Sequence, residues 1–370
     1  MKMAIFTDTF HPNVDGITIV LKNVVRLLKG KGNEVKIYCP GSLETKRNNT
    51  DNGIEYNLSL SVPVYPQYRL SLFPFLHFMN FKSEKFDVIH SHGIAAEGLT
   101  AILFSKLFKI PSIVTYHTNM DFLSHYISLG NNSIDLIMKK MIMGYTAWYL
   151  NQFDLVTVPS KNTQKKLKEY GLNSVVIPTF INGSIFTPSG KKPKKEFKIL
   201  SVGRIIKEKN FETLMLAFKK LREQFPEAEF TIVGEGPAEK YYKEFAEQKD
   251  VDVNFIGVVE NEKLPELYRK ADVFALSSVF ETQGLVALES IACGTPVVGI
   301  KNTSLGEIVS SGKNGYLAEN TPDDIADKIV KAKSIPRHKI HQTVKEATDE
   351  QIYYSNLMKI YGDLIESRKH

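Results

Sequence analysis

Short apolar segments that alternate with helical patterns constrain the fold of this chain more than any other feature. The segments lie at 3–6, 34–38, 88–90, 112–116 and 155–158 in the first half, and at 198–202, 229–233, 254–256, 273–276 and 296–299 in the second. Longer stretches with apolar residues at helical spacing lie between them, such as 17–29, 95–107, 134–150, 210–223, 239–248, 263–270 and 285–292. Strands that alternate with helices form parallel sheets covered by helices. The sequence therefore predicts an α/β fold with one parallel sheet in each half.

Length and composition limit the kind of protein this can be. The chain has 370 residues, enough for two domains, and a mild net charge of +6 that does not indicate a nucleic-acid partner. Its two cysteines, Cys39 and Cys293, are far apart, which argues against a disulfide framework and fits a reducing cytosol. The first strand begins directly after Met1, and no stretch reaches the ~20 apolar residues of a membrane span. We therefore expect a cytoplasmic protein whose domains divide near the lysine-rich stretch 187–195.

The run from Phe280 to Glu289 (FETQGLVALE) is the strongest indication of a ligand site. Glu281 lies in a loop between an apolar strand and a helix, and Glu289 follows eight positions later within that helix. The start of such a helix can bind an anion, most often phosphate, through unpaired backbone N–H groups. Carboxylates beside it suit hydroxyl groups, so the run suits a sugar nucleotide. Taken alone, the two glutamates are more often one surface and one helix residue, and it is the rest of the chain that favours the sugar nucleotide.

Two more strand ends in the second half carry residues suited to a diphosphate. Gly203 and Arg204 follow a strand, and Lys209 stands where the next helix begins. Arginine offers paired planar donors and lysine a point charge, so together they can hold a diphosphate. A cation at a helix start opposes the helix dipole, which indicates that Lys209 serves a ligand. Gly234, in a glycine-rich turn after the next strand, is a weaker candidate because many strands end this way.

The first half contributes two candidates. Gly16 opens the helix after the first strand, where a glycine lets the backbone approach a phosphate, although a plain turn explains it equally well. His117 comes directly off a later strand, where it can bond a substrate hydroxyl or make a structural contact. His90, His92 and His125 are weaker candidates, and no carboxylates or cysteines accompany them, so no metal site is predicted. The sequence has no G-x-G-x-x-G motif, which argues against NAD or FAD.

In this order the motifs resemble those of the family 4 retaining glycosyltransferases, which have the GT-B fold of two facing Rossmann-like domains. The matching pieces are DGIT at 15–18, YHT at 116–118, VGR with Lys209, VGEGP at 233–237 and FETQGLVALESIACGTPVV at 280–298. The last piece carries the family's E-x7-E motif and is the most specific. The resemblance implies that the C-terminal stretch packs back on the first domain. The expected domains are therefore 1–187 with about 352–370, and 188–351.

The resemblance also implies a reaction: transfer from a nucleotide-diphosphate sugar with retained anomeric configuration, without a metal ion or other cofactor. Arg204 and Lys209 would stabilise the leaving diphosphate. Glu281 would hold hydroxyls of the transferred sugar, Glu289 the ribose, and His117 would lie beside the anomeric centre or the 6-hydroxyl. Front-side attack is expected, with double displacement left open. The expected catalytic residues are His117, Arg204, Lys209 and Glu281, and the expected donor-binding residues are Gly16, Gly203, Arg204, Lys209, Gly234, Glu281, Gly284, Leu285, Val286 and Glu289.

The acceptor is predicted from local stretches of the first half. Residues 6–12 and 116–127 are similar to those of bacterial diacylglycerol glucosyltransferases. Residues 70–86 and 134–150 are apolar with lysines and suit an anionic membrane surface, or else form helices packed on the first domain's own sheet. We therefore expect UDP-glucose as donor and a lipid such as diacylglycerol as acceptor, at the inner face of the cell membrane. Mannosyl or other hexosyl transfer to a glycan, a phosphoinositol lipid or a small molecule stays open, and a sugar-nucleotide epimerase is the less favoured alternative.

Overall fold

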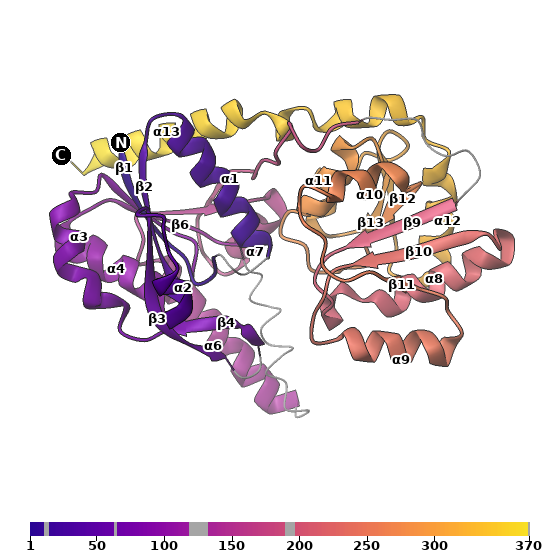
Figure 1. Cartoon of the computed structure of the whole chain (residues 1–370), viewed down its shortest axis with the longest axis horizontal. Helices are drawn as coiled ribbons and strands as arrows, with labels where there is room; N and C mark the ends of the chain where they lie inside the picture. The colour runs from indigo at the N-terminus through magenta and orange to yellow at the C-terminus, as the bar shows by residue number, and fades with distance from the viewer. Residues whose placement is uncertain (11–14, 63–64, 118–131, 189–196, 369–370) are drawn as a thin grey trace. The chain divides into compact units, whose positions relative to one another are not determined.

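The chain folds into two compact units, each built around its own sheet (Figure 1). The computed structural model describes residues 1–10, 15–62, 65–117, 132–188 and 197–368. Unit 1 comprises Met1–Pro178 with Gln351–His370, and unit 2 comprises Thr179–Glu350. Most of the expected lysine-rich linker, His125 and the remainder of the 116–127 stretch after His117 lie outside the described residues. Two helix-covered sheets of parallel strands confirm the predicted α/β class.

Unit 1 contains an eight-stranded sheet with the order β4-β3-β2-β1-β5-β6-β7-β8. Its strands are β1 (Lys2–Phe6), β2 (Glu34–Gly41), β3 (Ile54–Val62), β4 (Tyr65–Ser71), β5 (Val88–Ser91), β6 (Ser112–Thr115), β7 (Leu155–Val158) and β8 (Val175–Val176). Its helices are α1 (Gly16–Gly30), α2 (Leu43–Arg47), η1 (Pro74–His77, a 3₁₀ helix), α3 (Phe78–Glu84), α4 (Ala96–Phe108), α6 (Asn132–Leu150), α7 (Lys161–Glu169) and α13 (Glu350–Ser367). Every described strand pair is parallel except β3 with β4. This antiparallel pair was not predicted, although the strict alternation in 54–62 (IEYNLSLSV) is a strand signal.

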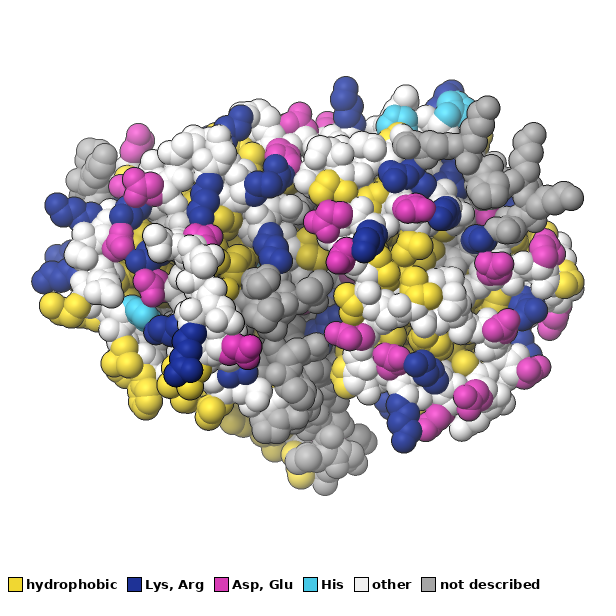
Figure 2. Space-filling view, in the orientation of Figure 1, with side chains coloured by type: hydrophobic (Ala, Val, Ile, Leu, Met, Phe, Trp, Pro, Cys, Tyr) yellow, Lys and Arg dark blue, Asp and Glu magenta, His cyan; other side chains and the backbone are white. Residues whose placement is uncertain are grey.

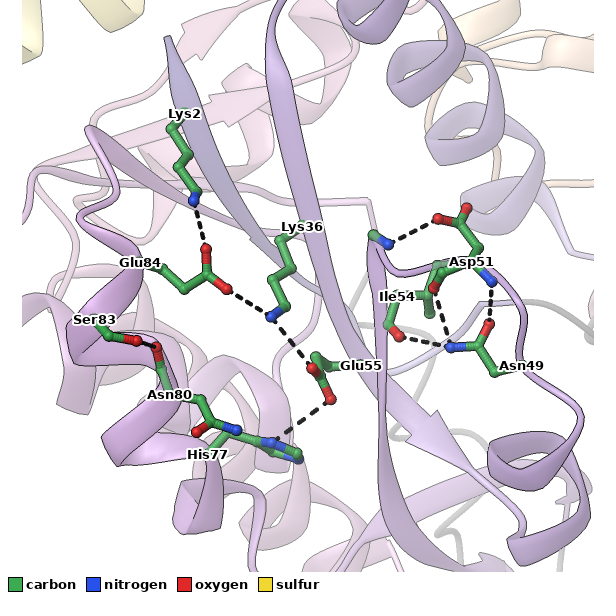
Figure 3. Close-up of polar contacts among 11 residues, drawn as sticks. Lys2, Lys36, Asn49, Asp51, Ile54, Glu55, His77, Asn80, Ser83 and Glu84 are labelled. Carbon is green, nitrogen blue, oxygen red and sulfur yellow. Dashed lines mark hydrogen bonds and ion pairs between the residues drawn. The ribbon is translucent and has the colours of Figure 1, made fainter.

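A ladder of polar and charged side chains attaches η1 and α3 to the sheet of unit 1, with His77 as its one imidazole (Figure 3). Glu84 pairs with Lys2 of β1 and with Lys36 of β2, whose Nζ atom lies 2.9 Å from its Oε1. Lys36 also lies 3.2 Å from Glu55 of β3, and Glu55 lies 3.8 Å from Nδ1 of His77. Such pairs contribute about 1 kcal/mol or less each. As a network they hold the short η1–α3 segment in a defined place.

The C-terminal helix α13 packs on unit 1. The hydroxyl of Tyr354 accepts a hydrogen bond from Asn33 at 3.3 Å, and the hydroxyl of Tyr361 lies 2.6 Å from Nδ1 of His90. Arg368, just beyond the helix, pairs with Asp154 at 2.7 Å. Among the helices of the described part of the chain, none combines the length and apolarity needed to cross a bilayer.

Unit 2 contains a six-stranded, fully parallel sheet with the order β11-β10-β9-β12-β13-β14. Its strands are β9 (Phe197–Val202), β10 (Ala228–Val233), β11 (Asn254–Phe255), β12 (Val273–Ala275), β13 (Val297–Ile300) and β14 (Gly315–Ala318). Its helices are η2 (Lys207–Lys209), α8 (Phe211–Gln224), α9 (Glu239–Lys249), α10 (Leu264–Lys270), α11 (Leu285–Ala292), η3 (Ser304–Glu307), α12 (Pro322–Lys333), η4 (Arg337–Val344) and η5 (Glu346–Thr348).

Alternating side chains of β9 build two separate cores in unit 2. Successive residues of a strand point to opposite faces of a sheet. Ile199 belongs to a buried cluster with Phe218 of α8, whereas Leu200 belongs to a second cluster with Tyr268 of α10 and Ile291 of α11. Because both faces are covered, polar side chains become accessible mainly where the strands end.

Glu97 gives unit 1 a measurable pH dependence. Its fully buried carboxyl accepts hydrogen bonds from Asn57 Nδ2 at 2.7 Å and from the hydroxyl of Ser71. Burial raises the pKa of Glu97 from 4.5 to about 7. Between these values the folded state keeps a proton that the unfolded state has lost, so the free energy of unfolding falls as the pH rises through this window.

We predict that Glu97→Gln, whose side chain stays neutral, abolishes the decrease in the free energy of unfolding between pH 4.5 and 7. Urea unfolding curves of wild type and variant should show a stability difference that grows in favour of the variant from pH 4.5 to 7. The total growth should be at most of the order of 3 kcal/mol. Glu169→Gln, at an exposed position of α7, is the matched control and should show no growth. A difference for Glu97→Gln that does not change with pH would contradict the assignment.

Candidate active site

Gly203 and Gly234 lie side by side at the carboxyl edge of the unit 2 sheet. They follow the paired strands β9 and β10, and the N–H of Gly203 donates to the carbonyl of Val233 at 2.9 Å. Gly234 has a φ of 134°, and a Cβ there would lie 2.0 Å from the carbonyl oxygen of Gly203. Packing alone therefore requires a glycine at 234. A Cβ at Gly203 would make an ordinary contact with Lys209 Cε at 3.6 Å, which places Lys209 beside this edge.

Lys209 and Glu281 form an ion pair at the same edge. Lys209 Nζ lies 2.6 Å from Glu281 Oε1, and their side chains are only 19% and 10% exposed. Lys209 ends η2, and its carbonyl accepts a hydrogen bond from the Ser277 hydroxyl at 2.8 Å. Residues 72 positions apart are thus brought into direct contact. The sequence analysis assigned both to the donor site but did not predict that they pair.

The loop that carries Glu281 is held from two sides. Its carbonyl accepts a hydrogen bond from Ser304 at 2.8 Å. Gln283, buried two residues later, donates to the carbonyl of Thr179 at 2.8 Å and accepts from its N–H at 3.1 Å. Gly284 then caps α11 with a φ of 86°, where a Cβ would lie 2.5 Å from a methyl group of Leu305. These contacts hold the start of α11 in place.

The start of α11 offers its first backbone N–H groups, including those of Leu285 and Val286, because the first turn of a helix has no intrahelical acceptors. Arg204 directly follows Gly203 and is half-buried at the same edge of the sheet. Cationic side chains and free N–H groups gathered in this way suit a diphosphate. The sequence analysis missed Gln283, since a polar residue inside a loop has no pattern that reveals its partner.

Glu289 lies in a different environment from Glu281. Its carboxyl is 3% exposed and accepts a hydrogen bond from the hydroxyl of Tyr268 at 2.8 Å. Burial raises the pKa of Glu289 to about 7, while the Tyr268 hydroxyl acts in the opposite direction. The structure therefore joins Lys209 and Glu281 directly, but places Glu289 against α10. Tyr268 was not among the predicted site residues.

Unit 1 places His117 at the end of β6, where Nε2 lies 2.8 Å from Nδ1 of His92. His92 follows β5, the neighbour of β6 in the sheet, so both side chains come from one edge. Burial lowers the pKa of His117 to about 4, which leaves the ring neutral at physiological pH. Gly16 opens α1 after β1, and a Cβ there would meet no atom of the described residues within 4 Å.

No group of three or more His, Cys, Asp or Glu side chains in the described residues is placed to hold a metal ion. The charged groups of unit 2 can instead bind an anionic ligand, with hydroxyl partners for Glu281. Unit 1 supplies neutral imidazole at its own sheet edge. Together with the fold, these features suit a glycosyltransferase that takes its sugar from a nucleotide sugar.

Comparison with known families leads to the same class. Residues 14–185 match the Glycosyltransferase Family 4 model, and residues 185–350 match the model of the Glycosyl transferases group 1. The chain belongs to the family 4 glycosyltransferases, which confirms the predicted membership.

Curated relatives and solved structures extend this result. The alpha-monoglucosyldiacylglycerol synthases of Streptococcus pneumoniae and Acholeplasma laidlawii are each 26% identical over 99% of this chain, and the matches cover 87% and 98% of the relatives. Sucrose-phosphate synthase from Thermosynechococcus elongatus superposes with a TM-score of 0.80 at 19% identity, covering 99% of both chains. Anabaena HepE in complex with UDP and glucose gives 0.76 at 16% identity, covering 98% of this chain and 100% of that one. These structures show the GT-B fold.

We predict that Lys209→Met abolishes most sugar transfer and donor hydrolysis. The substitution keeps an apolar stem of similar length but removes the charge that would face the leaving diphosphate. A loss of about a hundredfold in kcat/KM is expected. The melting temperature should fall somewhat, because Glu281 loses its counter-ion, so activity is measured well below the melting temperature of the variant. Lys207→Met, an exposed residue of the same 3₁₀ helix, removes one charge elsewhere and should stay near wild type. Near-normal turnover in Lys209→Met would exclude a diphosphate role for this residue.

Proposed function

We propose that this enzyme transfers glucose from UDP-glucose to diacylglycerol or a closely related lipid, with retention of the anomeric configuration and without a metal ion. The observation that carries the donor half is the Lys209–Glu281 pair beside the start of α11. A diphosphate that binds Lys209, Arg204 and the α11 amides takes the place of Glu281 as the partner of Lys209. Glu281 is then available to accept hydrogen bonds from hydroxyls of the transferred sugar.

Cationic groups at this edge also explain how the reaction proceeds without a metal. The negative charge that develops on the leaving diphosphate is stabilised by Lys209, Arg204 and the helix N-terminus. The leaving phosphate accepts the proton of the attacking hydroxyl, so the acceptor attacks from the face that the phosphate leaves and the configuration is retained. His117 contacts the transferred sugar, and Glu289 contacts the ribose through the carboxylate oxygen that Tyr268 does not occupy.

An exposed apolar surface on unit 1 supports a lipid acceptor. The segment formed by η1 and the start of α3 exposes Leu76 and Met79, each 73% accessible, together with Phe73 and Phe75. Lys82 and Lys85, both exposed, follow at the end of α3. Hydrophobic side chains gather along the lower edge of unit 1 in Figure 2. Large apolar side chains with lysines beside them suit insertion into an anionic membrane surface.

The helix α6 adds a second apolar face with the same character. Its exposed side chains include Ile137 at 58%, Met141 at 64% and Trp148 at 51%, and Lys139 and Lys140 are also exposed. The ion pairs of Glu84 with Lys2 and Lys36 fix α3 on the sheet, so the exposed apolar side chains of η1 and α3 belong to an ordered element. The names of the two synthases that match almost the whole chain specify an alpha-glucosyl diacylglycerol product. An α-linked product from α-linked UDP-glucose is the retaining outcome.

The decisive experiment is a transfer assay with the purified protein in EDTA. UDP-glucose, UDP-galactose and GDP-mannose are each supplied with anionic vesicles that contain or lack diacylglycerol. We expect UDP-glucose turnover that depends on diacylglycerol, with an α-linkage in the product by NMR. Loss of activity in EDTA that Mg²⁺ or Mn²⁺ restores would contradict metal independence. Donor hydrolysis that ignores the lipid would contradict the acceptor, and a β-linked product would contradict retention.

We predict that Leu76→Ser combined with Met79→Ser weakens vesicle binding and lipid glucosylation by about tenfold or more, because two large apolar side chains no longer enter the membrane. Binding of UDP to the variant should match wild type. The matched control is Ile256→Ser with Val258→Ser, two exposed apolar positions of unit 2 that are 38% and 51% accessible. If both double variants sediment with vesicles equally well, residues 73–79 do not contribute to membrane binding.

A further inference from the structure

The candidate histidine of unit 1 is held by a second histidine. Nδ1 of His92 lies 2.8 Å from Nε2 of His117, and the two rings stack with centroids 5.1 Å apart and planes inclined by 19°. His92 is 4% exposed, and its backbone N–H donates to the carbonyl of Phe6 at 2.7 Å. The ring that contacts His117 is therefore enclosed by the sheet and has no free rotation into solvent.

A third histidine, His90, packs against the ring of His92. The ring centroid of His90 lies 4.1 Å from that of His92. His90 Nε2 lies 2.6 Å from the hydroxyl of Thr115, and its Nδ1 lies 2.6 Å from the hydroxyl of Tyr361 on α13. The three imidazoles thus come from β5, from the residue after it and from the end of β6, and the C-terminal helix adds the Tyr361 hydroxyl to His90. His90 and His92 are two positions apart, so they lie on the same side of the chain as it leaves β5.

Burial keeps the three rings neutral. It lowers the pKa of His90 to about 3 and that of His117 to about 4. The pKa of His92 falls well below its ordinary value for the same reason, and the neighbouring imidazoles add to the effect. A neutral imidazole has one donor nitrogen and one acceptor nitrogen. One ring of the His92–His117 pair therefore donates, and the other accepts.

The surroundings of His92 decide which ring donates. Its Nε2 atom is buried and, within the part of the chain that the structure describes, has no hydrogen-bond partner. A proton on this atom would leave a buried N–H unpaired, which proteins avoid more strictly than an unused acceptor. His92 therefore carries its proton on Nδ1 and donates it to Nε2 of His117. The proton of His117 is then left on its own Nδ1.

We propose that His92 is a positioning residue that holds His117 in the Nδ1–H tautomer, so that His117 donates a hydrogen bond to a hydroxyl of the transferred sugar and does not act as a base. The identity of the sugar partner rests on the proposed function, whereas the tautomer rests on the contact between the two histidines. An Nδ1–H donor orients a hydroxyl oxygen without removing its proton. This leaves the leaving phosphate as the group that accepts the acceptor's proton.

The tautomer can be read directly by ¹⁵N NMR of protein labelled at its nine histidines. The signals of His117 are assigned by their loss in His117→Gln. We expect a protonated Nδ1 and an unprotonated Nε2 on His117 at pH 7, with and without UDP-glucose. A protonated Nε2 on His117 would overturn the proposal, whether or not the protein transfers sugar. The expected tautomer in a protein that transfers no sugar would contradict the proposed function and leave the histidine contact established.

Two substitutions of matched shape separate positioning from packing. His92→Leu removes the donor, whereas His92→Asn keeps an amide N–H near the place of Nδ1. We expect kcat to fall about tenfold in His92→Leu, the effect of one lost hydrogen bond, while KM for UDP-glucose stays within about twofold. Most of the proposed donor contacts lie in unit 2, so KM is expected to change little when one contact from unit 1 is weakened. His92→Asn should restore both kcat and the Nδ1–H signature of His117.

Tyr361→Phe provides the control, since it removes the hydroxyl that contacts His90 and leaves the His92–His117 contact untouched. It should keep the wild-type tautomer and kcat. Wild-type kcat and an unchanged His117 tautomer in His92→Leu would overturn the proposal. The proposal would also be overturned if the Leu and Asn variants lost the same activity while both melted at the wild-type temperature. The two side chains have similar shapes and only Asn can donate, so equal losses would indicate that His92 serves packing alone.

Discussion

Parallel strand pairing is the constraint on which both units depend. A parallel strand requires a long return connection to the other end of the sheet, so helices cover both faces and the functional loops gather at the carboxyl edge. In unit 2 that edge carries Gly203 after β9 and Gly234 after β10, with Glu281 in the loop beyond β12. In unit 1 it carries His92 after β5 and His117 after β6. Apolar side chains cover both faces of each sheet, so the candidate site residues gather mainly where the strands end.

The two sheet edges differ in charge: that of unit 1 carries neutral imidazole rings, and that of unit 2 carries an ion pair. In unit 1 burial depresses the pKa of His117 to about 4, so this edge presents neutral imidazole. In unit 2, Lys209 and Glu281 meet at 2.6 Å, and each carries the counter-ion that its partly buried partner needs. Removing either charge alone would leave the other uncompensated, which is costly away from water. An anionic ligand can replace the carboxylate as the partner of Lys209, and Glu281 then needs new hydrogen-bond donors, which hydroxyl groups of the ligand can supply.

The sequence predicted the parallel strands and placed Lys209 and Glu281 after strands of the same half, because strand periodicity and strand-end position are local signals. It did not reveal which distant side chains meet. Gln283 bonds Thr179 across 104 positions, and His92 meets His117 across 25. Neither contact can be predicted from residue spacing or composition, because both depend on which elements become neighbours in the folded chain. Local rules locate a residue on an element, whereas packing between elements selects its partner.

The two glutamates of the E-x7-E run show how one motif supplies two different environments. Glu281 precedes α11 in a loop pinned by Ser304, so its carboxylate reaches across to Lys209. Glu289 lies within the helix and faces α10, where the hydroxyl of Tyr268 is its partner. The spacing alone makes them look equivalent. The helix start between them separates a carboxylate paired with Lys209 at the sheet edge from an enclosed one whose pKa is about 7, so the exchange of partners that we propose concerns only the first of the two.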